Sequence, residues 1–88
     1  MFYVYVLMDT EGEKKYVGMT SDLKERIKQH QSHKTWTTSR MKNLKLIFYE
    51  AFLSKKDAVR REKYLKTSKG KSSLKQIIRE SIQYARVV

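Results

Sequence analysis

The chain has 88 residues and predicts a single domain, 1–88, with a small core, because a chain of this length buries only a little over about 60% of its unfolded surface. It contains no cysteine and only two histidines, which excludes a disulfide framework, a thiolate zinc site and a site with three histidine ligands. The lack of cysteine is compatible with a cytoplasmic location. The apolar N-terminal run is too short to span a bilayer and has no basic segment before it, so it predicts a strand.

Charge is the strongest feature of the composition, with 20 Lys and Arg against 9 Asp and Glu and a formal net charge of +11. Such a charge attracts polyanions and predicts salt-dependent binding to nucleic acid. A basic surface that serves only solubility and an attraction to anionic lipid are the alternatives. No strongly apolar amphipathic helix supports the membrane alternative, so nucleic acid is the expected partner.

Two β-prone segments, residues 2–8 and 15–19, flank a run of turn-forming residues and predict an antiparallel hairpin. If the turn is centred near residues 10–11, Tyr5 pairs directly with Tyr16, and the two phenols lie side by side on one face of the sheet. A register slip of one residue would separate them, because successive side chains alternate between faces.

A helix is predicted to follow, with Ser21 as its N-cap. Four residues of this helix fall on one stripe: Leu23, Arg26, Ile27 and His30. Arg26 and His30 therefore point towards the sheet or its edge. A charged side chain on a packing face is costly unless it has a partner or a task. The alternative is that Arg26 lays its aliphatic stem along the rim of the core.

Residues 31–43 lack clean periodicity and predict a basic loop, with or without a short helical turn. Trp36 in this loop either packs against the domain, and contributes to binding only at its edge, or stacks on an exposed base. Lys34, Arg40 and Lys42 are candidates for contacts with phosphate groups.

Residues 44–52 predict a third strand, and Ser54 with Asp57 forms a capping-box pattern that opens a helix running to about Lys66. Three residues of this helix share a stripe: Ala58, Glu62 and Leu65. Glu62 is thus an acid on the face expected to pack. It either forms a salt bridge with Arg26 or a neighbouring lysine, or it binds a divalent cation, since Mg²⁺ prefers hard oxygen ligands.

Residues 67–71 are predicted to break the helix at a glycine, with Ser72 or Ser73 capping a last helix. Lys69 and Lys71 are further candidates for contact with nucleic acid. The apolar stripe of the last helix is expected to close the core through Leu74, Ile77, Ile78, Ile82 and Ala85.

Several of these residues stand in the order of a known motif. Tyr3, Val4 and Tyr5 form a first half, Tyr16, Val17 and Gly18 form a second half, and Arg26, His30 and Glu62 follow. The chain resembles the GIY-YIG nuclease superfamily in this order and spacing, in particular its small single-domain members. The match covers nearly the whole chain.

The resemblance implies an α+β fold, a three-stranded antiparallel sheet flanked by helices in the order β-β-α-loop-β-α-α. It also implies an endonuclease that hydrolyses phosphodiester bonds with one divalent cation, Mg²⁺ or Mn²⁺, and that has little sequence specificity of its own. DNA is the expected polymer in preference to RNA, in cytoplasmic repair or recombination.

By the same resemblance, Glu62 would ligate the metal and Arg26 would offset charge on the phosphoryl oxygens. Tyr5 and Tyr16 would orient the attacking water, and one of them, Tyr5 by a slight preference, would be the general base. A phenol is mostly protonated at neutral pH, so such a base requires stabilisation of the phenolate. His30 would relay a proton or fix Tyr5 by a hydrogen bond.

The sequence departs from the family pattern at three places. Tyr3 replaces the first glycine, Met19 stands where some members carry a lysine or a small polar residue, and the late asparagine of longer members has only Ile77 near its slot. Two other function classes remain open at this point. One is a non-catalytic module that binds nucleic acid on the same fold, and the other is an adaptor for an acidic protein.

Overall fold

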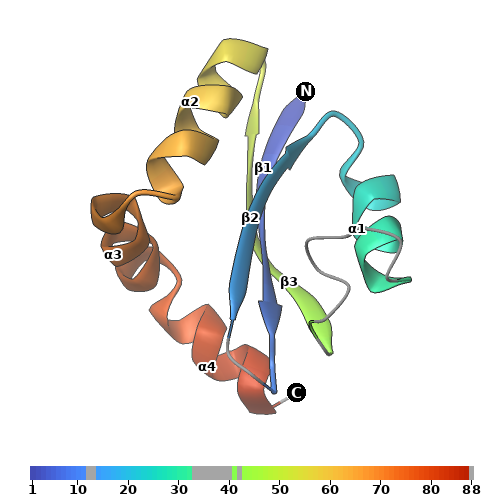
Figure 1. Ribbon diagram of the computed structural model, residues 1–88, viewed down its shortest axis with the longest axis vertical. Helices are drawn as coiled ribbons and strands as arrows, with labels where there is room; N and C mark the ends of the chain where they lie inside the picture. The colour runs from blue at the N-terminus through green and yellow to red at the C-terminus, as the bar shows by residue number, and fades with distance from the viewer. Residues whose placement is uncertain (12–13, 33–40, 42, 88) are drawn as a thin grey trace.

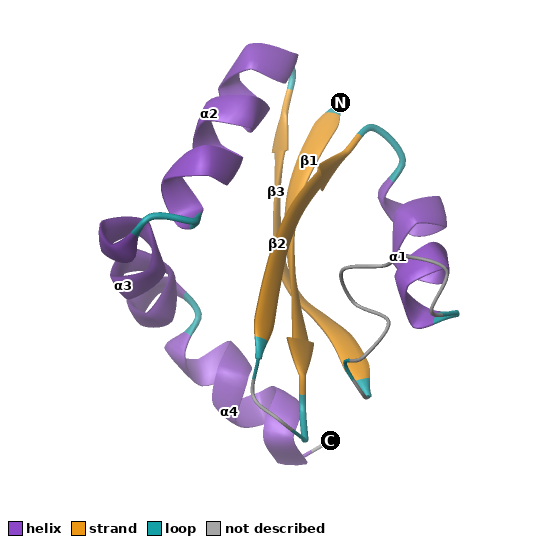
Figure 2. Ribbon diagram, viewed as in Figure 1, coloured by secondary structure: helices purple, strands orange, loops and turns teal. Residues whose placement is uncertain are grey.

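The computed structural model describes residues 1–11, 14–32, 41 and 43–87. The elements in chain order are β1 (Phe2–Asp9), β2 (Lys15–Thr20), α1 (Leu23–Gln31), β3 (Leu44–Phe52), α2 (Lys55–Leu65), α3 (Ser68–Ile77) and α4 (Arg79–Val87). The strands form one antiparallel sheet in the order β2-β1-β3. Helix α1 covers one face of the sheet, and α2, α3 and α4 lie along the other (Figure 1, Figure 2). The predicted α+β fold is therefore confirmed.

The register of the first hairpin differs from the predicted one. Tyr5 lies opposite Gly18, and Tyr16 lies opposite Leu7, so the direct pairing of the two tyrosines is wrong by two residues. The Asp9 carboxylate accepts a hydrogen bond from the Glu11 N–H at 2.9 Å, an Asx turn that moves the centre of the turn along the chain. Because a shift of two residues keeps every side chain on its face, the two phenols still share one face as diagonal neighbours.

Strand β3 contains a bulge where it pairs with the centre of β1. Val6 lies opposite Phe48 but Leu7 lies opposite Leu46, so Ile47 is the extra residue. Ile47 packs with the cluster beneath α2 to α4, together with Phe48. The bulge therefore gives that face two consecutive apolar side chains from one strand.

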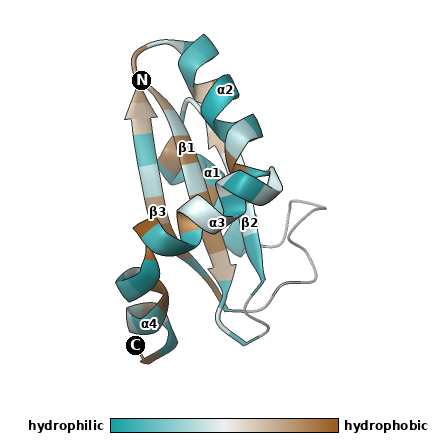
Figure 3. Cartoon of the chain, turned by 90° about the vertical axis from the view of Figure 1, so that its left-hand side faces the viewer, coloured by the Kyte–Doolittle hydropathy of each residue, from teal (hydrophilic) through white to brown (hydrophobic). Residues whose placement is uncertain are grey.

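The core is divided by the sheet into two layers. Beneath α2, α3 and α4 the buried residues are Val4, Val6, Ala58, Leu65, Leu74 and Ile78. Beneath α1 they are Tyr5, Leu7, Met41 and Leu44, with Tyr16, Leu23 and Ile27 packed against them. Figure 3 shows α2 as largely hydrophilic with short apolar segments, as expected for a helix that buries a single face. The second layer is smaller and contains the polar side chains that matter below.

The caps of the first two helices differ from the predicted ones. Asp22, not Ser21, caps α1, and its side chain accepts a hydrogen bond from the Glu25 N–H at 3.2 Å. Ser54 stands at the N-cap of α2 but makes no side-chain capping bond. The capping box does not form, and the Asp57 carboxylate pairs instead with Arg60 on the next turn.

The C-terminal part of the chain forms two helices where one was predicted. Thr67 caps α3 and accepts a hydrogen bond from the Gly70 N–H at 3.0 Å, so Gly70 lies inside this helix and neither Ser72 nor Ser73 is a cap. A Cβ at Gly70 would overlap the Tyr64 carbonyl group, so glycine is needed where α3 packs onto the end of α2. Ile77 is 52% exposed, which contradicts its predicted place in the core.

No helix in the described part of the chain is long and apolar enough to cross a membrane.

Candidate active site

A buried hydrogen bond joins the central strand to α1. The Tyr5 hydroxyl lies 2.8 Å from His30 Nε2, and both side chains are fully buried. The Tyr16 ring lies 6.2 Å from the Tyr5 ring and 5.1 Å from the His30 ring, measured between centroids. We call these three side chains the tyrosine–histidine cluster. It brings two strands and one helix to a single point.

Gly18 makes room for this cluster. Tyr5 lies opposite Gly18 in the sheet, and a Cβ built on Gly18 would stand 2.5 Å from the Tyr5 hydroxyl oxygen and 2.8 Å from Cε2 of Tyr16. These distances are shorter than real Cβ contacts. Gly18 is therefore required by close packing, because the Tyr5 phenol lies directly over its backbone.

The substitution Gly18→Ala is expected to lower the free energy of unfolding by about 1–3 kcal/mol, since the Tyr5 phenol must move from its place against His30. Urea unfolding measures this change. NMR of His30 should show the loss of its hydrogen bond at the same time. Val17→Ala is the control, because Val17 packs on the other face of β2 and should cost stability without altering His30. An alanine at position 18 with parental stability and an unchanged His30 signal would contradict this account of the packing.

Burial and charge set the protonation of the cluster. Burial raises the pKa of Tyr5 to about 12, although the adjacent Arg26 guanidinium opposes that rise. Burial, and then the charge of Arg26, lowers the pKa of His30 below 6.5. At neutral pH Tyr5 is therefore protonated and His30 is neutral. The Tyr5 O–H donates the hydrogen bond and His30 Nε2 accepts it.

Arg26 lies half-buried beside the cluster. Its guanidinium group interacts with the hydroxyls of both Tyr5 and Tyr16, which raises the pKa of Arg26 further. One guanidinium nitrogen also donates to the Gln29 side-chain oxygen at 2.9 Å. Arg26 is thus a permanent cation, held at the edge of a buried polar group with part of its fork directed at two phenols.

The buried neutral imidazole predicts a loss of stability in acid. A histidine whose pKa is lowered by folding stabilises the protein fully above 6.5, and this contribution is lost as the pH falls through the folded pKa. The free energy of unfolding should therefore decrease between pH 7.5 and 5. His30→Gln, which keeps an acceptor for Tyr5, should show a smaller decrease.

Urea unfolding of the parent and of His30→Gln across this pH range measures the effect. The difference between the two proteins isolates His30, since His33 and every carboxylate are present in both. A difference in stability that does not change with pH would show that His30 titrates as an exposed histidine does.

Glu62 comes from the other side of the sheet. It lies on the stripe of α2 that carries the buried residues Ala58 and Leu65, and its side chain is 23% exposed. Lys66 Nζ donates to its carboxylate at 3.1 Å, which is the neighbouring-lysine salt bridge considered from the sequence. Glu62 therefore faces inward from α2, whereas the tyrosine–histidine cluster lies under α1.

A groove of about 620 Å³ along the edge strand β2 is lined by Tyr16 from one of these parts and by Lys66, the partner of Glu62, from the other. We call it the lysine groove. The polar residues that line it are Lys15, Tyr16, Lys66, Lys71, Ser72 and Lys75. Tyr16 belongs to the cluster, and Lys66 holds Glu62. A molecule bound in this groove would contact a member of the cluster and the partner of Glu62 together.

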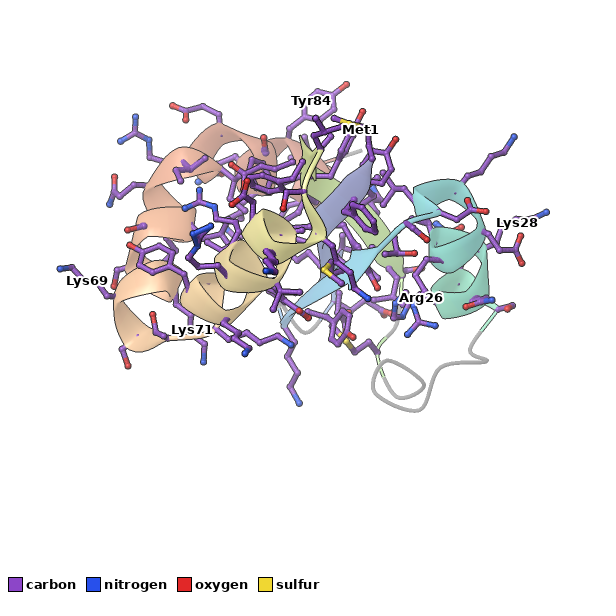
Figure 4. The ribbon with its side chains drawn as sticks, turned by 90° about the horizontal axis from the view of Figure 1, so that it is seen from above. Met1, Arg26, Lys28, Lys69, Lys71 and Tyr84 are labelled. Carbon is purple, nitrogen blue, oxygen red and sulfur yellow. The ribbon has the colours of Figure 1, made fainter. Side chains whose placement is uncertain are left out.

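The basic residues predicted to contact nucleic acid divide into two sets. Lys69 and Lys71 are exposed on α3, on the opposite side of the sheet from Arg26 (Figure 4), and Lys71 lines the lysine groove. The other four lie outside the described residues: Lys34, Trp36, Arg40 and Lys42. Lys15, Ser72 and Lys75 were not predicted from the sequence. The spacing of Lys71 and Lys75, one helical turn apart, was the available signal.

The donor set allows only a sparse metal site. Among the described residues, no group of three or more His, Cys, Asp or Glu side chains could hold a metal ion. Glu62 offers one inward carboxylate. Mg²⁺ is commonly held by one or two carboxylates, with water and substrate phosphate oxygens completing its shell. The residues present therefore fit a cation bound together with a phosphate substrate, and do not fit a cage made by protein alone.

Comparison with known proteins decides the family. Residues 1–76 match the GIY-YIG catalytic domain. The chain belongs to the GIY-YIG family. Membership places it in an endonuclease superfamily that acts on nucleic acid. In GIY-YIG terms, Tyr5 and Tyr16 are the tyrosines that end the first half of the motif and begin the second.

Relatives of similar size support the assignment. The chain is 34% identical over 84 residues to a UPF0213 protein of Clostridium perfringens (strain 13 / Type A), covering 94% of this chain and 89% of the relative. It is 39% identical over 66 residues to a UPF0213 protein of Streptococcus agalactiae serotype V, covering 73% of each.

A solved structure shares the fold. The solution NMR structure of a UPF0213 protein from Bacillus halodurans superimposes with a TM-score of 0.54 at 33% identity, over 88% of this chain and 85% of that chain. The names of these relatives state the family and no reaction, so the chemistry must be argued from the site.

Proposed function

We propose that this protein is a metal-dependent nuclease that hydrolyses phosphodiester bonds in nucleic acid. The observation that carries the proposal is the cluster itself. Tyr5, Tyr16 and His30 meet beside the Arg26 guanidinium, in a chain whose residues 1–76 match the GIY-YIG catalytic domain. A buried polar group of this kind costs stability, and such a cost is common where chemistry takes place.

Arg26 is the residue best suited to stabilise the negative charge that develops during hydrolysis. As the scissile phosphate is attacked, negative charge develops on its non-bridging oxygens, and a fixed cation nearby lowers the free energy of that state. The guanidinium group is already oriented by Gln29 and by the two phenols, so little reorganisation is needed when substrate binds. Arg26 thus acts on the phosphoryl oxygens directly.

Tyr16 is the better candidate for the residue that orients the attacking water. Tyr5 is fully buried, remains protonated because its pKa is about 12, and donates a hydrogen bond to His30. Tyr16 is partly exposed and lines the lysine groove, so its hydroxyl is accessible to water and substrate. We therefore assign the role of general base to Tyr16 and not to Tyr5, and assign to Tyr5 and His30 the role of holding Tyr16 and Arg26 in place.

Glu62 is the residue that would hold the divalent cation. When bound, the cation would supply Lewis-acid stabilisation of the phosphate and of the leaving oxygen. Lys66 Nζ donates to the Glu62 carboxylate at 3.1 Å, and a cation held by Glu62 would take the place of this ammonium group. Mg²⁺ and Mn²⁺ both suit a single hard oxygen ligand that is completed by phosphate and water.

DNA is the polymer we propose, with RNA as the alternative tested alongside it. The lysine side chains in the groove contact phosphates without reading bases, so little sequence preference is expected. The test is cleavage of single-stranded, duplex and branched DNA and of RNA, with Mg²⁺, with Mn²⁺ and with a chelator. A product ladder that depends on the metal is the expected result. Failure to cut any of these substrates would show that the proposal is wrong.

A second function is favoured by one observation. In the present arrangement Lys66 occupies the Glu62 carboxylate and Tyr5 is protonated, which also suits a module that only binds nucleic acid. Such a module would bind with strong salt dependence and would show no metal-dependent turnover. The same substrate panel separates the two functions, because a binder shifts the substrate in a gel without shortening it.

A further inference from the structure

We propose that the lysine groove binds the sugar-phosphate backbone of the nucleic acid on one flank of the reacting phosphate. The proposal rests on the proposed function only for the class of ligand. It assigns a path to that ligand along the edge of β2, between this strand and the helices α2 and α3 (Figure 1).

The lining of the groove is amphipathic in the manner that a backbone requires. Its apolar part comes from Val17, Leu65 and Leu74, and the two leucines are buried core residues. Four lysines surround this apolar part, and no acidic side chain is among the described residues that line the groove. Deoxyribose can pack on the apolar part while ammonium groups contact phosphates on either side.

The groove adjoins both halves of the proposed site, so a sugar-phosphate backbone bound in it would be aligned for cleavage. Tyr16 belongs both to its wall and to the tyrosine–histidine cluster, and Lys66 in its wall is bound to Glu62. A strand held by Lys15, Lys71 and Lys75 would therefore lie against Tyr16 and Lys66, one from each half of the proposed site. The groove thus aligns the strand before any metal-dependent step.

A second basic groove provides a matched comparison. It measures about 400 Å³ on the outward side of α2 and is lined by Lys55, Lys56, Val59, Arg60 and Lys63. It includes no member of the cluster, and Arg60 in it is paired with Asp57. The three lysines here are exposed like those of the lysine groove, so equal substitutions in the two grooves change the net charge equally.

The experiment measures binding without cleavage, with a fluorescent duplex DNA in the presence of a chelator. The triple substitution Lys15→Gln, Lys71→Gln, Lys75→Gln should lower affinity on the order of 100-fold at about 0.1 M salt. It should also reduce the slope of log affinity against log salt by about 2–3, since each phosphate contact contributes about 0.9. The triple Lys55→Gln, Lys56→Gln, Lys63→Gln should lower affinity only a few-fold and leave the slope within about 1 of the parent.

The outcomes are distinct. Equal losses of DNA affinity in the two triple variants, or no loss in either, would show that the lysine groove is not the binding site and that general electrostatic attraction accounts for the binding. Displacement of the DNA by polyglutamate at equal charge concentration would also overturn it, in favour of an acidic protein as the ligand. A triple Lys→Arg variant at positions 15, 71 and 75 should retain parental affinity, because it keeps all three charges, and parental urea unfolding of the glutamine triple excludes misfolding as the cause of its loss. If the parent protein binds DNA in this groove but never cuts it, the proposed nuclease activity is wrong and the proposed binding site stands.

Discussion

Arg26→Ala is expected to lower the rate of cleavage by about a thousandfold, because it removes the cation beside the phosphoryl oxygens. The free energy of unfolding should change little, since Arg26 is half-buried and Tyr5 keeps its hydrogen-bond partner His30. Single-turnover cleavage with saturating protein measures the effect on the chemical step. The affinity for DNA in the presence of a chelator should fall by no more than the contribution of one phosphate contact.

Two further variants make this result specific. Arg60→Ala removes the same charge from the outward side of α2 and should cut like the parent. Arg26→Lys keeps a charge without the planar fork that reaches both phenols, so it should recover part of the rate and not all of it. Cleavage by Arg26→Ala at the parental rate would remove Arg26 from the mechanism.

Glu62→Gln is expected to abolish cleavage to at least about a thousandfold below the parent at any Mg²⁺ or Mn²⁺ concentration, because it removes the single carboxylate offered to the cation. Affinity for DNA in the presence of a chelator should be equal or slightly higher, since the net charge rises by one and Lys66 is released into the lysine groove. A metal titration of the cleavage rate measures the first effect. The binding assay measures the second.

Glu50→Gln is the matched control for Glu62. Glu50 on β3 is also a half-buried carboxylate in an ion pair, with Arg61 at 2.7 Å and a 30% exposed side chain. Its loss should reduce stability, because Arg61 is left without its partner, and should leave the dependence on metal unchanged. If the two variants responded to metal in the same way, the assignment of Glu62 as ligand would fail.

Much of the fold followed from local patterns. The third strand was predicted with its observed ends, 44–52, because it is a β-prone run that follows Asn43 and stops just before the helix signal at Ser54. The phase of α1 directed Arg26 and His30 towards the sheet, and the structure brings both to the tyrosines. These predictions depended on the side-chain repeat of about 3.6 residues in a helix and 2 in a strand, which tertiary packing does not alter.

The remaining differences arise from contacts between residues that local patterns do not connect. The turn after β1 contains several residues that suit a turn equally well, and the Asp9 side chain selects one register among them. The sequence pattern predicts a helix stop at Gly70, whereas its close contact with the Tyr64 carbonyl comes from the packing of α3 on α2. The lysine groove combines residues of β2, α2 and α3, so only their arrangement in space reveals it.

The place of Tyr5 in the sheet affects how relatives of this protein can be judged. Tyr5 is on the middle strand, is completely buried and is flanked by Gly18 and Tyr49, so the fold itself requires an aromatic ring there. A lineage that lost the reaction would still keep this tyrosine for its packing. Arg26 and Glu62 lie at the margins and are under no such constraint. Under the proposed mechanism, we expect the presence of Arg26 and Glu62, more than that of the signature tyrosine, to separate cutting relatives from inactive ones.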